Sequence, residues 1–292
     1  MGVPVGFTLQ PEERFLSETT QLALAGADYF EVAPETLWRF DGDGRMAPNG
    51  FFDVFLELGR RHAKRFVAHG VGWSPGSASD RDGRRARWLD AITRTHDAFC
   101  FDWYSDHLGA TVWDGQELVL PLAVPMDAEA AQRSRAHLQQ LQSVVPDVGL
   151  ENTAAYFLFG EPLDEPAFLR DVLAGERLHL VLDLHNVYTM ALNMGFDATD
   201  YIDRLPLERV VEMHVSGGSA SDPAWMPDGS VLRLDSHDSA VPEAVFDLLV
   251  ATLPRCPNLR GVTLERMEGT VGDGDADVLE RELARLRELC TS

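Results

Sequence analysis

The sequence predicts an α/β protein in which eight parallel strands close into a barrel and each strand is followed by a helix. Short apolar, β-rich runs alternate with amphipathic stretches of helical length, and no Pro/Gly-rich linker interrupts them. The 292 residues match the usual size of such barrels, and a hydrophobic content of 45% is ample for a core. We therefore expect a single-domain (β/α)8 TIM barrel over residues 1–292.

Eight runs are predicted as strands because they are short, apolar and rich in β-branched or aromatic residues. The sixth run is nearly continuous in apolar residues, which is typical of a buried parallel strand, yet it ends in Asp183, His185 and Asn186. Several other runs also end in a charged side chain. In chain order the predicted strands cover residues 3–9, 29–32, 65–71, 98–104, 148–150, 178–186, 210–215 and 261–264.

The stretches between these strands have the apolar spacing of helices. In the first of them Phe15, Thr19 and Leu22 recur on one face. The predicted helices cover residues 12–25, 51–64, 84–97, 127–144, 164–174, 198–205, 240–253 and 275–290. Residues 74–82 and 219–238 are predicted loops, and residues 109–124 are expected to be irregular around an apolar run at 118–124.

Charge and cysteine content exclude several classes of function. A net charge of −22 and a pI near 4.6 argue against nucleic acid or an anionic membrane surface as a partner, because both require a basic footprint, whereas a cationic peptide would be attracted. Lys64 is the only lysine, which removes most candidates for Schiff-base chemistry. Cys100, Cys256 and Cys290 are too scattered for a disulfide framework. Without a leader or a membrane-spanning apolar run, we expect a cytoplasmic protein.

In a barrel of this kind the active site is built at the carboxyl ends of the strands. A lone histidine or carboxylate there is more often a hydrogen-bonded core residue or a helix cap, so the prediction depends on their convergence. Four other histidines lie on helices or at a strand start and are expected to be structural: His62, His96, His137 and His179. The candidates are Glu31, Glu35, His69, His107, Glu151, Asp183, His214, Asp235, His237 and Glu265.

The chemistry of this set indicates a metal site. Imidazoles and carboxylates without thiolates suit Fe, Mn or Zn better than Mg or Ca. The set exceeds what one ion needs, so two or three metals sharing bridging carboxylates are expected. The sequence has no nucleophile elbow, Walker loop or Rossmann glycine fingerprint, which removes the commonest competing enzyme classes.

An ordered series of short motifs carries a resemblance over most of the chain. The motifs are His69-Gly70-Val71-Gly72, Ser105-Asp106-His107-Leu108, Leu150-Glu151-Asn152, Leu182-Asp183-Leu184-His185-Asn186-Val187-Tyr188, Asn193-Met194-Gly195-Phe196-Asp197, Glu212-Met213-His214-Val215-Ser216-Gly217, Asp235-Ser236-His237 and Leu264-Glu265. In this order they resemble the multinuclear non-haem iron-dependent oxidative enzymes, the TIM-barrel family of the methanobactin oxazolone-forming and thiaglutamate-pathway enzymes.

The resemblance implies a centre of two or three irons of mixed Fe(II)/Fe(III) valence. It also implies a cysteine-containing precursor peptide as substrate, dioxygen as oxidant and, in many relatives, a small partner protein that presents the peptide. A ferric ion would bind the thiolate and a ferrous ion would activate dioxygen, starting with loss of a hydrogen next to sulfur. The implied metal-binding positions are His69, His107, Glu151, Asp183, Asn186, His214, Asp235, His237 and Glu265, of which Asp183, His214, Asp235 and His237 are expected to be catalytic.

Three positions depart from the family pattern. His185 stands where the family usually has asparagine, and Met194 and Gly218 stand where it usually has histidine. A changed neighbour of a metal ligand can shift metal choice and redox potential. His185 would offer a replacement ligand, but successive residues of a strand face opposite sides, so we expect it beside the ligands rather than among them.

Two other classes of function stay open. One is a divalent-metal (Zn or Mn) barrel of the sugar-isomerase or endonuclease type, acting as an isomerase, epimerase or hydrolase. The strong acidity counts against the nucleic-acid version, and the lack of a strand-end lysine weakens the isomerase version. The other is a non-catalytic barrel that binds a partner through an acidic face. The converging imidazoles and carboxylates argue against it, because a site without a function has no physical reason to keep like charges together.

The segments expected to touch substrate follow two strand ends. They are residues 74–81 and 219–234, with Trp73, Trp225 and Trp113 as candidate contacts, although ordinary loop anchoring explains these side chains equally well.

Overall fold

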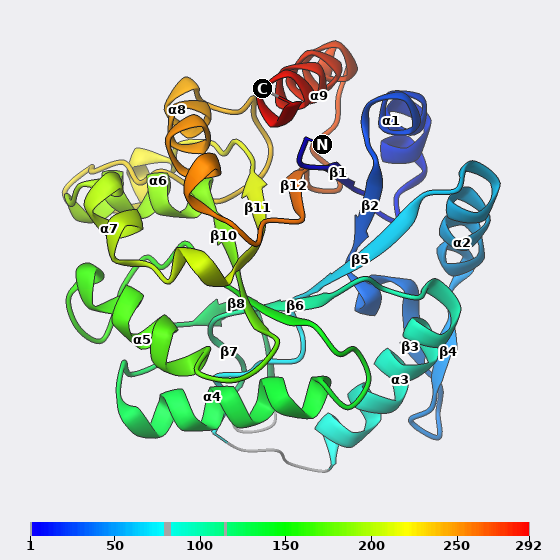
Figure 1. Ribbon diagram of the computed structural model, residues 1–292, viewed down its shortest axis with the longest axis horizontal. Helices are drawn as coiled ribbons and strands as arrows, with labels where there is room; N and C mark the ends of the chain where they lie inside the picture. The colour runs from blue at the N-terminus through cyan, green and yellow to red at the C-terminus, as the bar shows by residue number, and fades with distance from the viewer. Residues whose placement is uncertain (1, 79–82, 114–115, 292) are drawn as a thin grey trace.

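The computed structural model describes residues 2–78, 83–113 and 116–291. Within these ranges eight parallel strands close into a barrel, which confirms the predicted fold (Figure 1). The barrel strands are β1 (Val5–Thr8), β2 (Tyr29–Val32), β5 (Arg65–Gly70), β6 (Tyr104–His107), β9 (Val148–Glu151), β10 (Leu178–Asp183), β11 (Val210–Val215) and β12 (Gly261–Leu264).

Each barrel strand pairs with the strands before and after it in the chain, and β1 closes the ring between β2 and β12. Gly6 is opposite Tyr29 on one side and Thr263 on the other. Because all the pairings are parallel, the carboxyl ends of the eight strands meet at one end of the barrel. Side chains that follow these ends are therefore brought together from distant parts of the sequence.

Helices surround the barrel (Figure 1). Their apolar faces are buried against the strands. They are α1 (Glu13–Gly26), α2 (Gly50–His62), α3 (Arg84–Phe99), α4 (Ala128–Leu141), α5 (Glu165–Val172), α6 (Leu184–Met194), α7 (Ala198–Arg204), α8 (Glu243–Thr252) and α9 (Asp275–Thr291). The two ends of the chain meet, since α9 packs beside α1 and the Val3 N–H donates to the Cys290 carbonyl at 2.9 Å. Among the described helices, none has the length and apolar character needed to cross a membrane.

The predicted sixth strand is too long. Strand β10 ends at Asp183, and residues 184–186 form the first turn of α6, a helix that the sequence analysis does not predict. The cause is the Asp183 side chain, which accepts a hydrogen bond from the Asn186 N–H at 2.6 Å and so caps the helix. His185 and Asn186 are therefore helical residues, and the strand-alternation argument for His185 does not apply.

The predicted fourth strand is also wrong. Residues 98–99 complete α3, and the strand starts only at Tyr104. Phe99 continues the buried face of the helix, with its ring 4.9 Å from that of Phe66. Cys100 ends the helix in the left-handed conformation (φ 55°), and its N–H donates to the His96 carbonyl at 2.7 Å. The apolar run here belongs to a helix end and a buried connection.

Residues 109–124 are more ordered than predicted. They contain an antiparallel hairpin of β7 (Ala110–Trp113) and β8 (Gln116–Leu122), in which Val112 is opposite Glu117. A second hairpin, β3 (Trp38–Phe40) with β4 (Met46–Pro48), follows β2. Both hairpins are inserted after barrel strands, and short 3-10 turns complete the connections at Pro34–Leu37, Pro162–Asp164, Leu207–Arg209, Pro223–Trp225 and Leu253–Arg255.

Candidate metal centre

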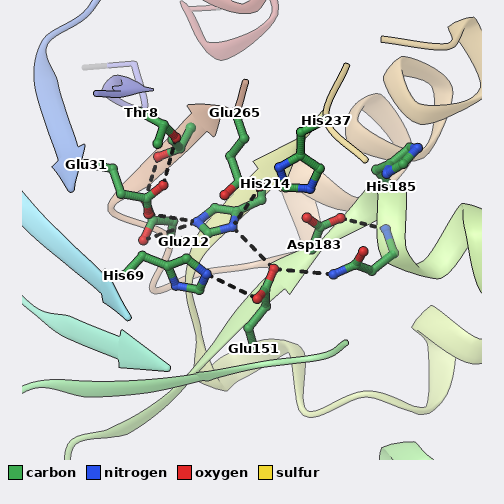
Figure 2. Close-up of polar contacts among 12 residues, drawn as sticks. Thr8, Glu31, His69, Glu151, Asp183, His185, Glu212, His214, His237 and Glu265 are labelled. Carbon is green, nitrogen blue, oxygen red and sulfur yellow. Dashed lines mark hydrogen bonds and ion pairs between the residues drawn. The ribbon is translucent and has the colours of Figure 1, made fainter. Parts of the chain in front are cut away.

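Imidazole and carboxylate side chains gather at the carboxyl ends of the barrel strands (Figure 2). Most of them lie near the end of a strand or directly after it and are buried, whereas Asp235 and His237 lie on the long segment between β11 (Val210–Val215) and α8 (Glu243–Thr252). In three overlapping groups and a separate fourth one, at least three ligand atoms lie within 4.8 Å of one another. These groups are Glu31, His69 and His214; His69, His107 and Glu151; Glu151, Asp183, His214 and Glu265; and His185, Asp235 and His237.

His69 on β5 and His107 on β6 both face Glu151 at the end of β9. Their Nε2 atoms lie 3.2 Å and 3.0 Å from the same oxygen, Glu151 Oε2. Their Nδ1 atoms are held from behind, at 2.8 Å from Ser105 Oγ and 3.1 Å from the Gly70 carbonyl. Hydrogen bonds of this kind fix the orientation of an imidazole and leave its other nitrogen for a metal.

The second oxygen of Glu151 faces a different group. Its Oε1 lies 3.4 Å from His214 Nδ1, and Glu265 Oε2 approaches the same nitrogen at 3.3 Å. Asp183 completes this group from the end of β10. Glu151 therefore contributes one oxygen to each of two groups, which is the arrangement of a bridging carboxylate.

Asp183 is held rigidly by its neighbours. The side chain of Asn152 donates to the Asp183 carbonyl and accepts from the Asp183 N–H, both at 3.0 Å. The amide nitrogen of Asn186 donates to the Asn152 carbonyl at 3.0 Å and lies 3.4 Å from Glu151 Oε1. These contacts tie the end of β9 to the start of α6 and fix Asp183 against the strand end.

Two further carboxylates lie behind His214, deeper in the barrel. Its Nε2 is 3.1 Å from Glu31 Oε2 and 3.7 Å from Glu212 Oε2 (Figure 2). Glu31 also accepts a hydrogen bond from Thr8 Oγ1 at 3.0 Å.

Glu212 is fully buried and lies below His214 on the same strand. It accepts from Tyr29 Oη at 2.9 Å, from Trp103 Nε1 at 2.6 Å and from Thr263 Oγ1 at 2.5 Å. A buried carboxylate requires such partners, so Glu212 is an integral part of the barrel interior.

The charges of these groups strongly shift one another. Burial raises the pKa of Asp183 well above its ordinary value, and the neighbouring charges of Glu151 and Glu265 raise it further. Burial also opposes ionisation of Glu151, but the imidazoles of His107 and His69 hold its pKa well below the usual range. Burial alone would lower the pKa of His107, whereas the Glu151 carboxylate raises it to about 10. Such a set is held together by shared protons or by a bound cation.

The buried atoms themselves fit a cation. Among the described residues, several buried carboxylate, amide and imidazole atoms converge here without forming a hydrogen bond, an arrangement that is costly unless a metal binds them. These atoms are Glu31 Oε2, Glu151 Oε2, Asp183 Oδ2, Asn186 Oδ1, His214 Nδ1 and Nε2, and Glu265 Oε2. Their mixed nitrogen and oxygen character suits Fe, Mn or Zn.

Glu35 lies outside the four groups, and His185 belongs to one of them. Glu35 binds the turn after β5, where its Oε1 accepts from the N–H groups of Val71 and Gly72 at 2.6 Å and 2.8 Å. His185, expected beside the ligands, faces Asp235 in one of the groups. The four histidines expected to be structural, His62, His96, His137 and His179, lie outside all four groups.

The expected substrate contacts need one correction. Trp73 is fully buried and its Nε1 donates to the His137 carbonyl at 3.0 Å, so it anchors the turn and does not face a substrate. Trp225 is 65% exposed on the segment after β11. Residues 79–81 and the side chain of Trp113 lie outside the described parts of the chain.

The sequence analysis does not single out several residues that surround the candidate ligands. Glu212 precedes His214 by two residues, and this spacing puts both side chains on the same face of a strand, so a signal was available. Ser105 precedes His107 by the same spacing, whereas Thr8 carries no comparable signal, because its hydroxyl acts through a contact with Glu31 on the neighbouring strand.

Comparison with known proteins shows which sequences the chain resembles. A sequence model described as RiPP precursor modification enzyme MbnB/TglH/ChrH matches residues 4–291. A UPF0276 protein of Bordetella pertussis is 36% identical over 219 residues, which cover 70% of this chain and 74% of that protein. A UPF0276 protein of Pseudomonas aeruginosa is 32% identical over 240 residues, covering 82% of this chain and 77% of that protein.

Solved structures share the fold at low sequence identity. A xylose isomerase domain protein from Planctomyces limnophilus superposes with a TM-score of 0.60 at 16% identity, covering 100% of this chain and 97% of that one. A D-psicose 3-epimerase crystallised with D-fructose gives a TM-score of 0.60 at 13% identity, covering 99% and 100%. Identities this low establish a shared barrel only.

Proposed function

The chain belongs to the RiPP precursor modification enzyme family MbnB/TglH/ChrH, whose members modify ribosomally synthesised peptides, and from this premise we propose that it is an iron-dependent oxidase or oxygenase. It would act on a cysteine of a precursor peptide, with dioxygen as the oxidant. Its cofactor would be two or three iron ions of mixed Fe(II)/Fe(III) valence.

The observation that carries this proposal is the double role of Glu151. One of its oxygens faces His69 and His107, and the other faces His214. Two groups that share one carboxylate are suited to a multinuclear centre rather than to a single ion. The buried atoms around Glu151 that form no hydrogen bond among the described residues support the same reading.

The proposed ligands are His69, His107, Glu151, Asp183, Asn186, His214, Asp235, His237 and Glu265. Bound irons would supply a binding position for the cysteine thiolate and the electron transfer that reduces dioxygen. Asn152 would keep the Asp183 carboxylate facing the centre, through its paired hydrogen bonds to the Asp183 backbone. Ser105 and the Gly70 carbonyl would keep the Nε2 atoms of the two histidines turned toward Glu151.

The substrate is proposed from the family and the charge of the chain. In the reaction the cysteine residue would lose hydrogen next to its sulfur, and dioxygen would accept the electrons. A net charge of −22 would attract a precursor peptide with a basic leader segment. We also propose a small partner protein that presents the peptide. Asp183, His214, Asp235 and His237 are the residues proposed to contact the reacting groups.

The isomerase and epimerase alternative rests on fold likeness alone. A lysine cannot act as the base of a sugar isomerisation at this centre. Lys64 is the only lysine, and it precedes β5 at the amino end of the barrel. Its Nζ donates to the Ala27 carbonyl at 2.5 Å. A hydrolase or isomerase that uses its metal only as a Lewis acid would turn over substrate without consuming dioxygen. The experiment below distinguishes this alternative from the oxidase.

The experiment is elemental analysis of the protein expressed in iron-supplemented medium and purified without chelator, combined with its Mössbauer spectrum. We expect about two or three irons per chain, with both valences present. Oxygen consumption in the presence of a cysteine-bearing peptide encoded near the gene should follow the iron content. Zinc or manganese alone, with no iron retained and no oxygen consumed, would contradict the proposal and favour the isomerase or hydrolase alternative.

A further inference from the structure

One group of ligand atoms is built from segments outside the barrel strands. His185 comes from the first turn of α6, and Asp235 and His237 come from the segment between β11 and α8. Asp235 Oδ1 lies 3.2 Å from His185 Nδ1 and 2.8 Å from His237 Nε2. We propose that these three side chains form a metal-binding position of their own, suited to Fe(II), in which His185 is a ligand. The inference rests on the proposed metal-dependent function and names one of its positions.

The composition of the group favours this reading. Two imidazoles and one carboxylate are the ligand set that non-haem Fe(II) oxygenases use, and this set leaves further coordination positions open. The side chains of Asp235 and His237 are 22% and 14% exposed, whereas that of His185 is fully buried. The position is therefore closed on the helix side and accessible on the side of the segment, where a substrate would approach.

The ring of His185 is held in place by the start of α6. Asp183 caps this helix, and the cap sets the direction in which the next two side chains leave the backbone. One turn later Thr189 Oγ1 lies 3.5 Å from His185 Nε2, so the hydroxyl faces the nitrogen that does not point at Asp235. An imidazole held from one nitrogen presents the other to a metal.

The segment that carries Asp235 and His237 is fixed at several points. Asn193 on α6 bonds both the N–H and the carbonyl of Arg233, at 2.8 Å and 2.9 Å. The Asp235 N–H donates to Tyr156 Oη at 3.0 Å. His237 adopts the left-handed conformation (φ 49°), which is unfavourable for a residue with a side chain. Backbone strain of this kind persists where the surrounding structure imposes it, often at functional sites.

Space for the His185 ring is provided by Gly218. A Cβ atom at position 218 would lie 3.0 Å from His185 Cε1 and 1.9 Å from the Leu234 carbonyl oxygen. A larger residue at position 218 would therefore displace either the ring or the segment. Gly218 therefore lies against the His185 ring, and the absence of a side chain at position 218 accommodates the histidine.

The test compares metal uptake by the apoprotein with that of the variant His185→Asn. Co(II) is the probe, titrated without dioxygen and followed by stoichiometry and by its visible absorption. We expect the wild-type protein to bind one equivalent more than His185→Asn, or to bind that equivalent at least about tenfold more tightly. The absorption of that equivalent should be missing in the variant. His62→Asn, on the exposed face of α2, is the matched control and should behave as the wild type.

Two further variants separate the outcomes. His107→Ala, which leaves the cap of α6 intact, should lose metal from the group around Glu151 but keep the equivalent that depends on His185. If His185→Asn does not fold, His185→Gln repeats the comparison. Unchanged stoichiometry and absorption in the position-185 variant would overturn this inference and leave the proposed function standing. Failure of the wild-type protein to bind any metal would contradict both.

Discussion

Glu31 is expected to set which nitrogen of His214 faces the metal centre. Glu31 Oε2 lies 3.1 Å from His214 Nε2, and Thr8 fixes its other oxygen. Once a metal binds Nδ1, the proton of the imidazole would lie on Nε2 and be donated to Glu31, with the lone pair of Nδ1 directed toward Glu151 and Glu265. The substitution Glu31→Gln keeps the size of the side chain but removes its charge.

The expected magnitude follows from the burial of this pair. The side chains of Glu31 and His214 are 1% and 0% exposed, so water does not screen their contact. A hydrogen bond to a charged group contributes about 1.5–3 kcal/mol, against about 0.5–1.5 kcal/mol for a neutral one. The difference of about 1–1.5 kcal/mol corresponds to a roughly 5–12-fold weaker metal affinity.

The assay is a competition titration of Co(II) between a chelator and each protein variant. Glu31→Gln should bind the same number of ions as the wild type with reduced affinity, and Glu57→Gln, on the exposed surface of α2, should be unchanged. Affinity equal to that of the wild type would refute the orienting role of Glu31. Loss of a whole equivalent would also refute it, because Glu31 would then be a ligand.

Three other outcomes are expected. Asp183→Ala should remove metal from the Glu151 group and abolish activity while the barrel stays folded, whereas His62→Ala should change neither; full loading of Asp183→Ala, measured by elemental analysis, would mean that the site is wrongly assigned. Burial raises the pKa of Glu165 to about 7 from an ordinary 4.5, so the wild-type protein should lose stability as pH rises from 4.5 through 7, by at most about 3 kcal/mol. Urea unfolding at pH 5 and pH 8 measures this loss, and Glu165→Gln should not show it. Gly218→Ala should lower the unfolding temperature, since the new methyl group would overlap the Leu234 carbonyl, with a cost of about 1–3 kcal/mol; an unchanged melting curve would contradict this packing.

The barrel was predictable because its signal is repeated along the chain. Eight apolar runs alternate with amphipathic stretches, and an error in one element does not change the pattern. The errors occurred where a local contact decides the boundary. The cap formed by Asp183 ends β10 and starts α6, and the packing of Phe99 on Phe66 extends α3 into a run that resembles a strand.

The convergence of strand-end side chains could also be predicted, and their role as metal ligands stays a prediction. Residues at strand ends, such as His69, Glu151 and His214, could be named because the fold brings strand ends together. The arrangement within the group could not be derived, because it depends on side-chain directions. The sequence alone does not show that Glu151 faces two groups, or that His185 turns from α6 toward Asp235.

The closed interior beneath His214 limits how ions and substrate would reach the proposed centre. Tyr29 and Trp103, both buried, meet at Glu212 and fill the barrel below the ligands. Ions and substrate of the proposed centre would therefore pass through the same rim, formed by the segments that follow the strands. A peptide bound at that rim would block the path by which ions dissociate. Metal should therefore dissociate more slowly from the peptide complex than from the free protein.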